Sequence, residues 1–170
     1  MLNVRRHEHL FASSRESIVT VERIFTRAPS SNSQTEHNAV RVVAGSGVEG
    51  DRYFACQEEP GQNITFIEAE EIESFFAEQQ CPPDMSVTGR NIITRSIRLN
   101  ELVGTEFLVG TVRFRAVELC EPCLGFGKAL ATSSLPPAMV VKRMLHRAGL
   151  RANALSSGEL AVGAKFHNDA

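Results

Sequence analysis

The sequence has no marked excess of either charge. Its 18 basic and 20 acidic residues leave a net charge of −2. Proteins that bind nucleic acid through bulk charge have a clear basic surplus. The composition therefore excludes that class of partner, and any anion-binding site must be a local arrangement of a few residues.

Long apolar runs are also missing. No stretch approaches the roughly 20 apolar residues that a membrane-spanning helix requires, so we expect no membrane segment. The N-terminus, M-L-N-V-R-R-H-E-H-L-F, lacks the long apolar core of a signal peptide. We therefore expect a cytoplasmic protein whose thiols stay reduced.

Cysteine is scarce and tryptophan is absent. Four cysteines in 170 residues are too few for a disulfide scaffold, and in the cytosol a close cysteine pair is more often catalytic, redox-active or metal-binding. The length suits one domain, and 42% hydrophobic residues are enough to bury a core. We expect residues 1–16 to form an N-terminal arm and residues 17–170 to form the domain.

Short β-branched runs separated by turn residues dominate the chain, in no regular alternation with helices. This pattern predicts a mainly β or α+β fold, like a β-barrel with a few peripheral helices. Strands are predicted in or near 17–25, 39–44, 63–67, 88–94, 99–109 and 112–119, and in a final hairpin around Ser157-Gly158. Helices are predicted at 68–80 and 138–147, with a shorter one in 124–132, and an exposed loop at 27–38. Gly149 is expected to cap the helix that precedes it.

The most reactive groups lie in the segment C-E-P-C-L-G-F-G, after the strand Val112–Leu119. We predict that Cys120 and Cys123 lie on a short turn marked by proline and glycine. A thiolate there could ligate a soft metal or carry sulfane sulfur as a persulfide. Either role needs nearby positive charge, for which the chain offers three candidates: Arg52, Arg90 and Lys128.

Other interpretations of the cysteine pair stay open. C-x-P-C resembles the dithiol of thioredoxin-like oxidoreductases, although no βαβ pattern surrounds it. A structural zinc site would need two further ligands, and the candidates are Cys56, Cys81 and His146. The cysteines could also be small buried residues at a strand end.

Three further segments could bind anions. In the glycine-rich segment Gly45–Phe54, backbone amides and Arg52 could hold a phosphate, or Asp51 and Arg52 could pair with each other in a tight turn. Arg90 and Asn91 offer a guanidinium fork and an amide, although Asn91 could instead cap a turn. Arg147 and Arg151 could close an anion pocket or complement a helix dipole.

Taken in order, these motifs resemble the MOSC domain, known as a stand-alone bacterial protein and as the C-terminal domain of molybdenum cofactor sulfurases. The resemblance rests on six blocks: G-V-E-G-D-R (Gly47–Arg52), Gln62 with I-T-F-I, G-R-N-I (Gly89–Ile92), L-V-G-T-E-F-L-V-G-T-V (Leu102–Val112), C-E-P-C, and the ending from His146 to Gly163. Two positions differ from the common pattern: Tyr53 stands where histidine is frequent, and Arg90 where many members have glutamate.

The resemblance implies a mostly β, barrel-like fold that binds a molybdenum–pterin cofactor or a sulfur species, without pyridoxal phosphate. Cys123 matches the family cysteine and is the implied metal ligand and catalytic residue, assisted by Cys120. The residues expected to bind the cofactor are Gly50, Asp51, Arg52, Arg90, Asn91, Arg147 and Arg151.

The implied function is cofactor binding, sulfur transfer, or both. An enzyme of this kind would be a molybdenum-dependent oxidoreductase acting on a small N-oxygenated substrate, or a sulfurtransferase-like protein. The alternatives are a non-catalytic module that delivers its ligand and a dithiol oxidoreductase. Expected partners are the small-molecule ligand and a redox or cofactor-biosynthesis protein.

Overall fold

Strands form the larger share of the secondary structure in the computed structural model, which describes residues 19–56 and 62–167. The expected N-terminal arm and the loop 57–61 lie outside this part. The strands are β1 (Thr20–Thr26), β2 (Thr35–His37), β3 (Ala39–Val43), β4 (Gly47–Val48), β5 (Ile64–Glu68), β6 (Ile92–Arg95), β7 (Glu106–Val109), β8 (Val112–Leu119), β9 (Leu150–Ala154), β10 (Gly158–Ala161) and β11 (Phe166–His167). The helices are α1 (Ala69–Glu78), α2 (Leu124–Leu130) and α3 (Pro137–Arg143), with 3-10 turns η1 (Met85–Thr88) and η2 (Leu99–Leu102).

Eight of the strands form one curled sheet in the order β11-β7-β8-β9-β5-β6-β1-β2, and β10, β3 and β4 form a smaller sheet. The pairings within the large sheet are antiparallel except for the parallel pair β5–β6. The large sheet curls back on itself, since the Val21 amide of β1 donates to Ala164 O (2.9 Å), just before β11. The expectation of a β-rich, barrel-like α+β fold is confirmed.

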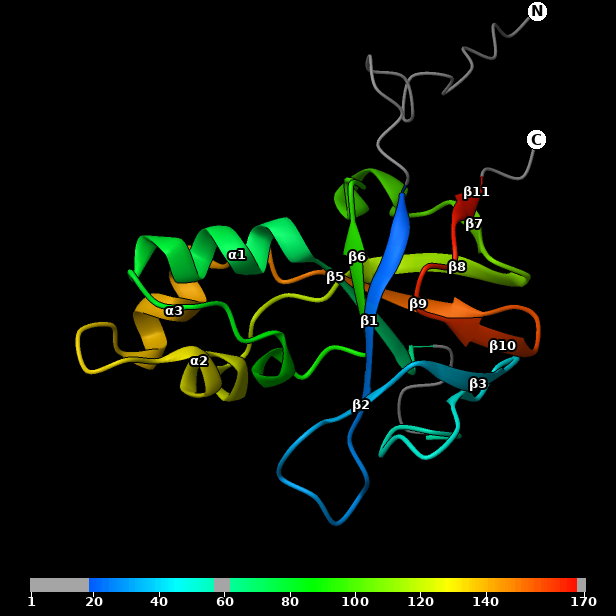
Figure 1. The fold of residues 1–170 in the computed structure, drawn as a ribbon, viewed down its shortest axis with the longest axis horizontal. Helices are drawn as coiled ribbons and strands as arrows, with labels where there is room; N and C mark the ends of the chain where they lie inside the picture. The colour runs from blue at the N-terminus through cyan, green and yellow to red at the C-terminus, as the bar shows by residue number, and fades with distance from the viewer. Residues whose placement is uncertain (1–18, 57–61, 168–170) are drawn as a thin grey trace, which may run out of the picture.

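The central strands are buried on both faces. Successive residues of β5 point to opposite sides: Phe66 lies in the core enclosed by the curled sheet, whereas Ile67 faces a second core beneath the helices. Figure 1 shows the three helices grouped on one side of the strands. The continuous apolar run I-T-F-I in the sequence follows from this double burial.

Two strand predictions near the chain ends need correction. The predicted hairpin around Ser157-Gly158 is wrong, because β9 pairs with β8 and β5 in the large sheet whereas β10 pairs with β3 in the small one. The predicted loop 27–38 contains the short strand β2, which pairs with β1. The partner of β10 is distant in sequence, which local patterns do not reveal, whereas β2 pairs with the strand immediately before it.

The helix prediction for 68–80 is confirmed by α1, which buries Ala69, Ile72 and Phe75. The helix predicted at 138–147 already ends at Arg143, so Gly149 does not cap it as expected. Gly149 instead lies against β5, where a Cβ atom would come within 1.9 Å of Phe66 O. Among the described residues, no helix is long and apolar enough to span a membrane.

Candidate functional site

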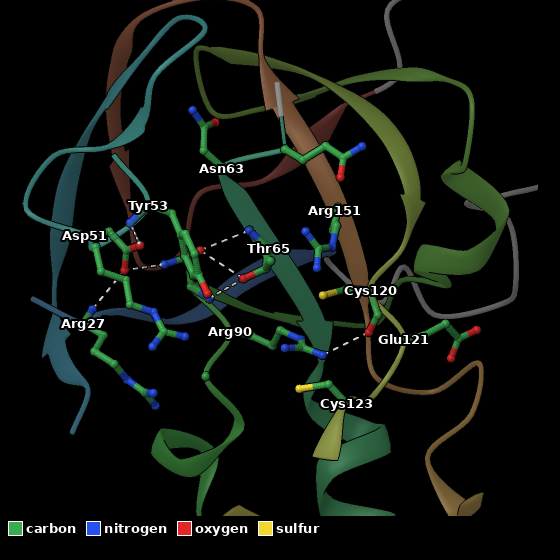
Figure 2. Close-up of a pocket in the computed structure, with 14 residues that line it drawn as sticks. Arg27, Asp51, Tyr53, Asn63, Thr65, Arg90, Cys120, Glu121, Cys123 and Arg151 are labelled. Carbon is green, nitrogen blue, oxygen red and sulfur yellow. Dashed lines mark hydrogen bonds between the residues drawn. The ribbon is translucent and has the colours of Figure 1, made fainter. Parts of the chain in front are cut away.

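A cavity of about 150 Å³ opens where several segments distant in sequence meet. Figure 2 shows its walls around the start of β5, the end of β8 and the beginning of α2. The lining residues are Arg27, Asp51, Arg52, Tyr53, Gln62, Asn63, Thr65, Gly89, Arg90, Asn91, Cys120, Glu121, Cys123 and Arg151. Four arginines and both cysteines of C-E-P-C therefore share one site.

The turn predicted at Cys120–Cys123 is wrong. This segment contains neither a turn nor a bend, and Cys123 has φ −96° and ψ 174°. Cys120 is anchored at the end of β8, where its amide donates to Gly149 O (2.8 Å) and its side chain is buried. Both cysteines are free, and the buried Cys120 lacks the exposure that a reactive thiol pair needs.

Cys123 is exposed and immediately precedes α2. Its Sγ accepts a hydrogen bond from the Phe126 amide (3.5 Å). This bond lowers the pKa of the Cys123 thiol; the Gly125 amide and the charge of Arg90 act in the same direction, and partial burial opposes them. The side chain therefore has the two properties expected of a reactive thiol, exposure and a stabilised thiolate.

Arg90 is a buried cation next to both cysteines, with a relative exposure of 8%. Its Nε donates to Ala148 O (2.8 Å) and its Nη2 to Cys120 O (3.0 Å), while its guanidinium lies over the Phe126 ring at 4.9 Å. Burial lowers the pKa of Arg90, and the charges of Cys120 and Cys123 oppose this shift. Among the described residues no carboxylate forms an ion pair with it.

Asp51 and Asn91 hold the cavity walls together. Asp51 accepts hydrogen bonds from the amides of Arg27 (2.9 Å) and Tyr53 (3.1 Å) and from Asn91 Nδ2 (3.1 Å). Asn91 Oδ1 in turn accepts from the amide and hydroxyl of Thr65. Asp51 therefore does not pair with Arg52 as one interpretation supposed, and its role here is to position neighbouring residues.

The other three arginines of the cavity differ in their exposure and in their ion pairs. Arg52 is exposed and stacks on Tyr53, with its guanidinium carbon 4.6 Å from the ring centroid. In the part of the chain that the structure describes, neither Arg52 nor Arg27 forms an ion pair with a carboxylate. Arg151 lies 3.8 Å from a carboxylate oxygen of Glu118. The cavity thus carries local positive charge on a chain that is slightly acidic overall.

Two expected binding residues lie elsewhere. Arg147 binds Glu71, with 2.6 Å between Nε and Oε2, and does not line the cavity. Gly50 is outside the lining as well, and the next two amides already donate to Val48 O and Arg27 O. The expected backbone phosphate site is therefore not formed by those two amides.

Arg27 was not predicted at the site, because it lies in a segment that the sequence predicts as an exposed loop. It directly follows β1 and lines the cavity beside Gly89 and Asp51. Its position after a buried strand is the only sequence signal that points to it. Gln62 was noted only as part of the family pattern, and Asn63 and Thr65 only as strand residues.

The described residues offer no ligand cluster for the zinc site that the sequence left open. Within residues 19–56 and 62–167, no three His, Cys, Asp or Glu side chains come together as a metal site would require. His146, one of the proposed ligands, instead binds Glu121 through Nδ1 (2.6 Å). Cys56 and Cys81 are free and do not line the cavity.

Comparison with known proteins gives one family and several similar folds. The family model described as "MOSC domain" matches residues 55–167, more than half of the chain. The YuaD protein from Bacillus subtilis has a similar structure (TM-score 0.75, 14% identity), covering 87% of this chain and 93% of that chain.

Two YiiM structures are similar as well. The protein from Geobacillus stearothermophilus has a TM-score of 0.66 and 15% identity over 87% of this chain and 73% of that chain. The Escherichia coli protein has a TM-score of 0.60 and 13% identity, over 89% of this chain and 71% of that chain. Identities this low show a shared fold alone, and no curated protein sequence matches this chain.

Proposed function

The chain belongs to the MOSC domain family, and from this premise we propose that its cavity binds a molybdenum–pterin cofactor with Cys123 as the metal ligand. One observation carries the proposal: an exposed thiol of lowered pKa stands beside a cavity lined by four arginines. A thiolate without positive surroundings would not suit an anionic cofactor, and arginines without the thiol would not suit its metal.

The donor groups of the cavity fit such a ligand. A thiolate is a soft donor, which suits molybdenum, and guanidinium groups match phosphate oxygens. The Nε of Arg27 is buried without a hydrogen-bond partner, a state that buried polar groups rarely keep. The fit therefore rests on the chemistry of these side chains.

Each side chain has a separate task in this proposal. Cys123 would hold the metal, and Arg27 and Arg52 would hold the anionic groups of the pterin. Arg151 would add to the positive charge, while the hydrogen bonds of Asp51 and Asn91 would hold the cavity walls in place. The bound molybdenum would supply oxygen-atom or electron transfer to a small substrate.

A second candidate is a carrier that accepts the cofactor or a sulfane sulfur and delivers it to another protein. The observation that favours it is the exposure of Cys123 together with Leu124 and Gly125. A thiol at the protein surface can be reached by a partner, whereas a purely internal ligand would not need such access.

Metal and pterin analysis tests both candidates. The full chain should be produced in cells that make the cofactor and then assayed for molybdenum, pterin fluorescence and labile sulfur. Cys123→Ser should lose the bound species, and Cys81→Ser, which changes an exposed thiol outside the cavity, should retain them. Absence of molybdenum, pterin and labile sulfur from the wild-type protein would overturn the proposal.

Turnover separates an enzyme from a carrier. With a reductant and an N-oxygenated test substrate in excess, an enzyme should form many equivalents of product per protein. A carrier should transfer one equivalent to an acceptor and then stop. Multiple turnovers that depend on Cys123 would exclude the pure carrier.

A further inference from the structure

Arg90 is an unusual cation because it is fixed in place and lacks a carboxylate partner in the described chain. Its guanidinium is bound by two backbone carbonyls and packed against Phe126. These carbonyl groups accept hydrogen bonds from two of its N–H donors but do not neutralise its charge. A buried charge without a counter-charge is unfavourable, so an anion close to Arg90 would stabilise this site.

The cysteines are the nearest groups able to supply that anion. Figure 2 shows the Arg90 guanidinium between the sulfur atoms of Cys120 and Cys123, and both thiols interact with its charge. Cys120 is buried, whereas Cys123 is exposed at the cavity wall. Cys123 is therefore the sulfur that a ligand can reach while remaining within the field of Arg90.

Bond formation at Cys123 changes this balance. When the thiolate binds an electrophilic atom or a metal centre, its negative charge is shared with the ligand and acts less strongly on Arg90. A neutral ligand would leave Arg90 without compensation. A ligand that carries its own negative charge next to the bonded atom would replace the lost interaction.

We propose that Arg90 makes Cys123 selective for anionic ligands, namely electrophilic or metal centres that carry a negative charge beside the atom that sulfur binds. The inference rests on the proposed function only in assuming that the ligand occupies this cavity. It assigns Arg90 the role of a specificity-determining residue.

Two alkylating reagents of similar size test this selectivity. With iodoacetate or iodoacetamide, the Cys123 thiolate attacks the CH₂ carbon, an S–C bond forms, the C–I bond breaks and iodide leaves with the electron pair. The adduct keeps a carboxylate in the first case and is neutral in the second. Because both reagents consume the same thiolate, the ratio of their rates is independent of the ionised fraction.

The rates should be measured on the full chain prepared without cofactor, by mass spectrometry of the Cys123 peptide. Cys81 provides an internal control, since it is exposed and does not line the cavity. We expect the iodoacetate-to-iodoacetamide ratio at Cys123 to exceed that at Cys81 by roughly tenfold. Arg90→Gln should remove most of this preference, and Arg90→Lys, which keeps the charge, should retain part of it.

Lys128→Gln is the matched control for charge, because it removes one exposed cation of α2 that does not line the cavity. It should leave the ratio almost unchanged. Equal ratios at Cys123 and Cys81 in the wild-type protein would overturn the proposal, even if the Arg90 variants did not fold. Since the labelled preparation contains no cofactor, this outcome is independent of the molybdenum analysis.

Discussion

The thiol of Cys123 lies where its ionised form is favoured. The Phe126 amide lowers its pKa most, with help from the Gly125 amide and the charge of Arg90. Since the thiolate is the reactive form, alkylation of cofactor-free protein by iodoacetamide should reach half its maximal rate at a lower pH than alkylation of a free cysteine. The measurement is the rate of labelling at Cys123 as a function of pH.

Arg90→Gln provides the control for this profile. It should move the midpoint upward, because one of the charges that stabilise the thiolate is removed. The midpoint should still remain below that of a free cysteine, since both amides persist. A wild-type midpoint at or above that of a free cysteine would contradict the assigned environment.

Sequence alone locates the reactive residues better than it describes their contacts. Cys123, Arg52, Arg90 and Asn91 were all expected at the site, and all four line the cavity. The extended backbone at Cys123 was not foreseen, because proline and glycine near a strand end usually indicate a turn. Burial of Arg90 was not foreseen either, since it depends on carbonyl groups at Cys120 and Ala148, which are distant in sequence.

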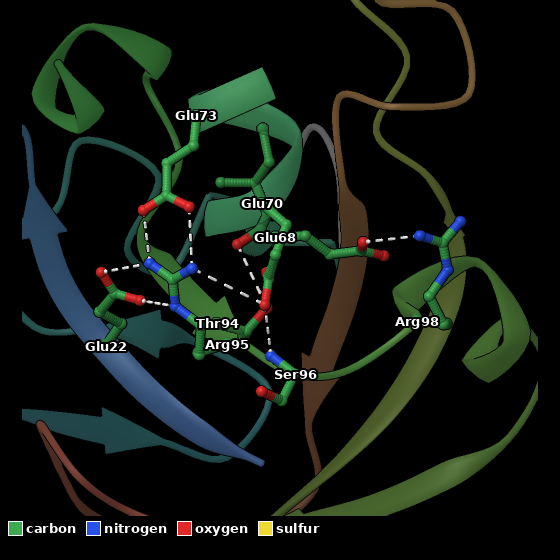
Figure 3. Close-up of polar contacts among 9 residues, drawn as sticks. Glu22, Glu68, Glu70, Glu73, Thr94, Arg95, Ser96 and Arg98 are labelled. Atoms are coloured by element: carbon green, nitrogen blue, oxygen red, sulfur yellow. Dashed lines mark hydrogen bonds and ion pairs between the residues drawn. The ribbon is translucent and has the colours of Figure 1, made fainter. Parts of the chain in front are cut away.

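At the level of elements, one arginine forms ion pairs with both helix α1 and the curled sheet. Arg95, at the end of β6, donates to Glu22 of β1 (2.5 Å) and to Glu73 of α1 (2.6 Å), as Figure 3 shows. Arg95→Met would leave the carboxylates of Glu22, Glu70 and Glu73 without their shared cation. We expect the free energy of unfolding at pH 7, measured by urea denaturation, to fall by about 1–2 kcal/mol.

The pH dependence of this loss follows from Glu73. Its pKa is lowered chiefly by the hydrogen bond from Arg95, so the contribution is present above the ordinary carboxyl pKa of 4.5 and disappears as pH falls through the lower folded value. The difference between wild type and Arg95→Met should therefore shrink below about pH 4.5. Arg41→Met, which breaks an exposed pair with Glu49, should change stability very little at any pH.

Elements with a strong local signal were predicted, and elements defined by remote partners were not. The helix α1 has a continuous apolar face and an acidic first turn, both visible in the sequence. The strands β9 and β10 looked like one hairpin because Ser-Gly separates them, yet they pair in different sheets. Turn chemistry indicates where a strand ends, but the partner of the next strand is set by packing.

For the molecule as a whole, the curled sheet and the cavity depend on one another. Strands β5 and β9 and the residue that follows β8 supply both sheet contacts and cavity walls, through Thr65, Arg151 and Cys120. Gly149 lies at this junction: its carbonyl accepts from the Cys120 amide, and its Cα faces β5. Its position therefore links the packing of the sheet to the placement of the cysteine segment.

Gly149→Ala should consequently disrupt both. The added Cβ would lie 1.9 Å from Phe66 O, and the residue has φ +99°, so backbone strain adds to a direct clash with a central strand. We expect the free energy of unfolding to fall by about 3 kcal/mol or more in urea denaturation. Gly50→Ala is the matched control: φ is +83° but nothing lies within 4 Å, so only the conformational penalty of about 1–2 kcal/mol applies. If the two variants lost equal stability, the close approach of Gly149 to β5 would not be a determinant of the fold.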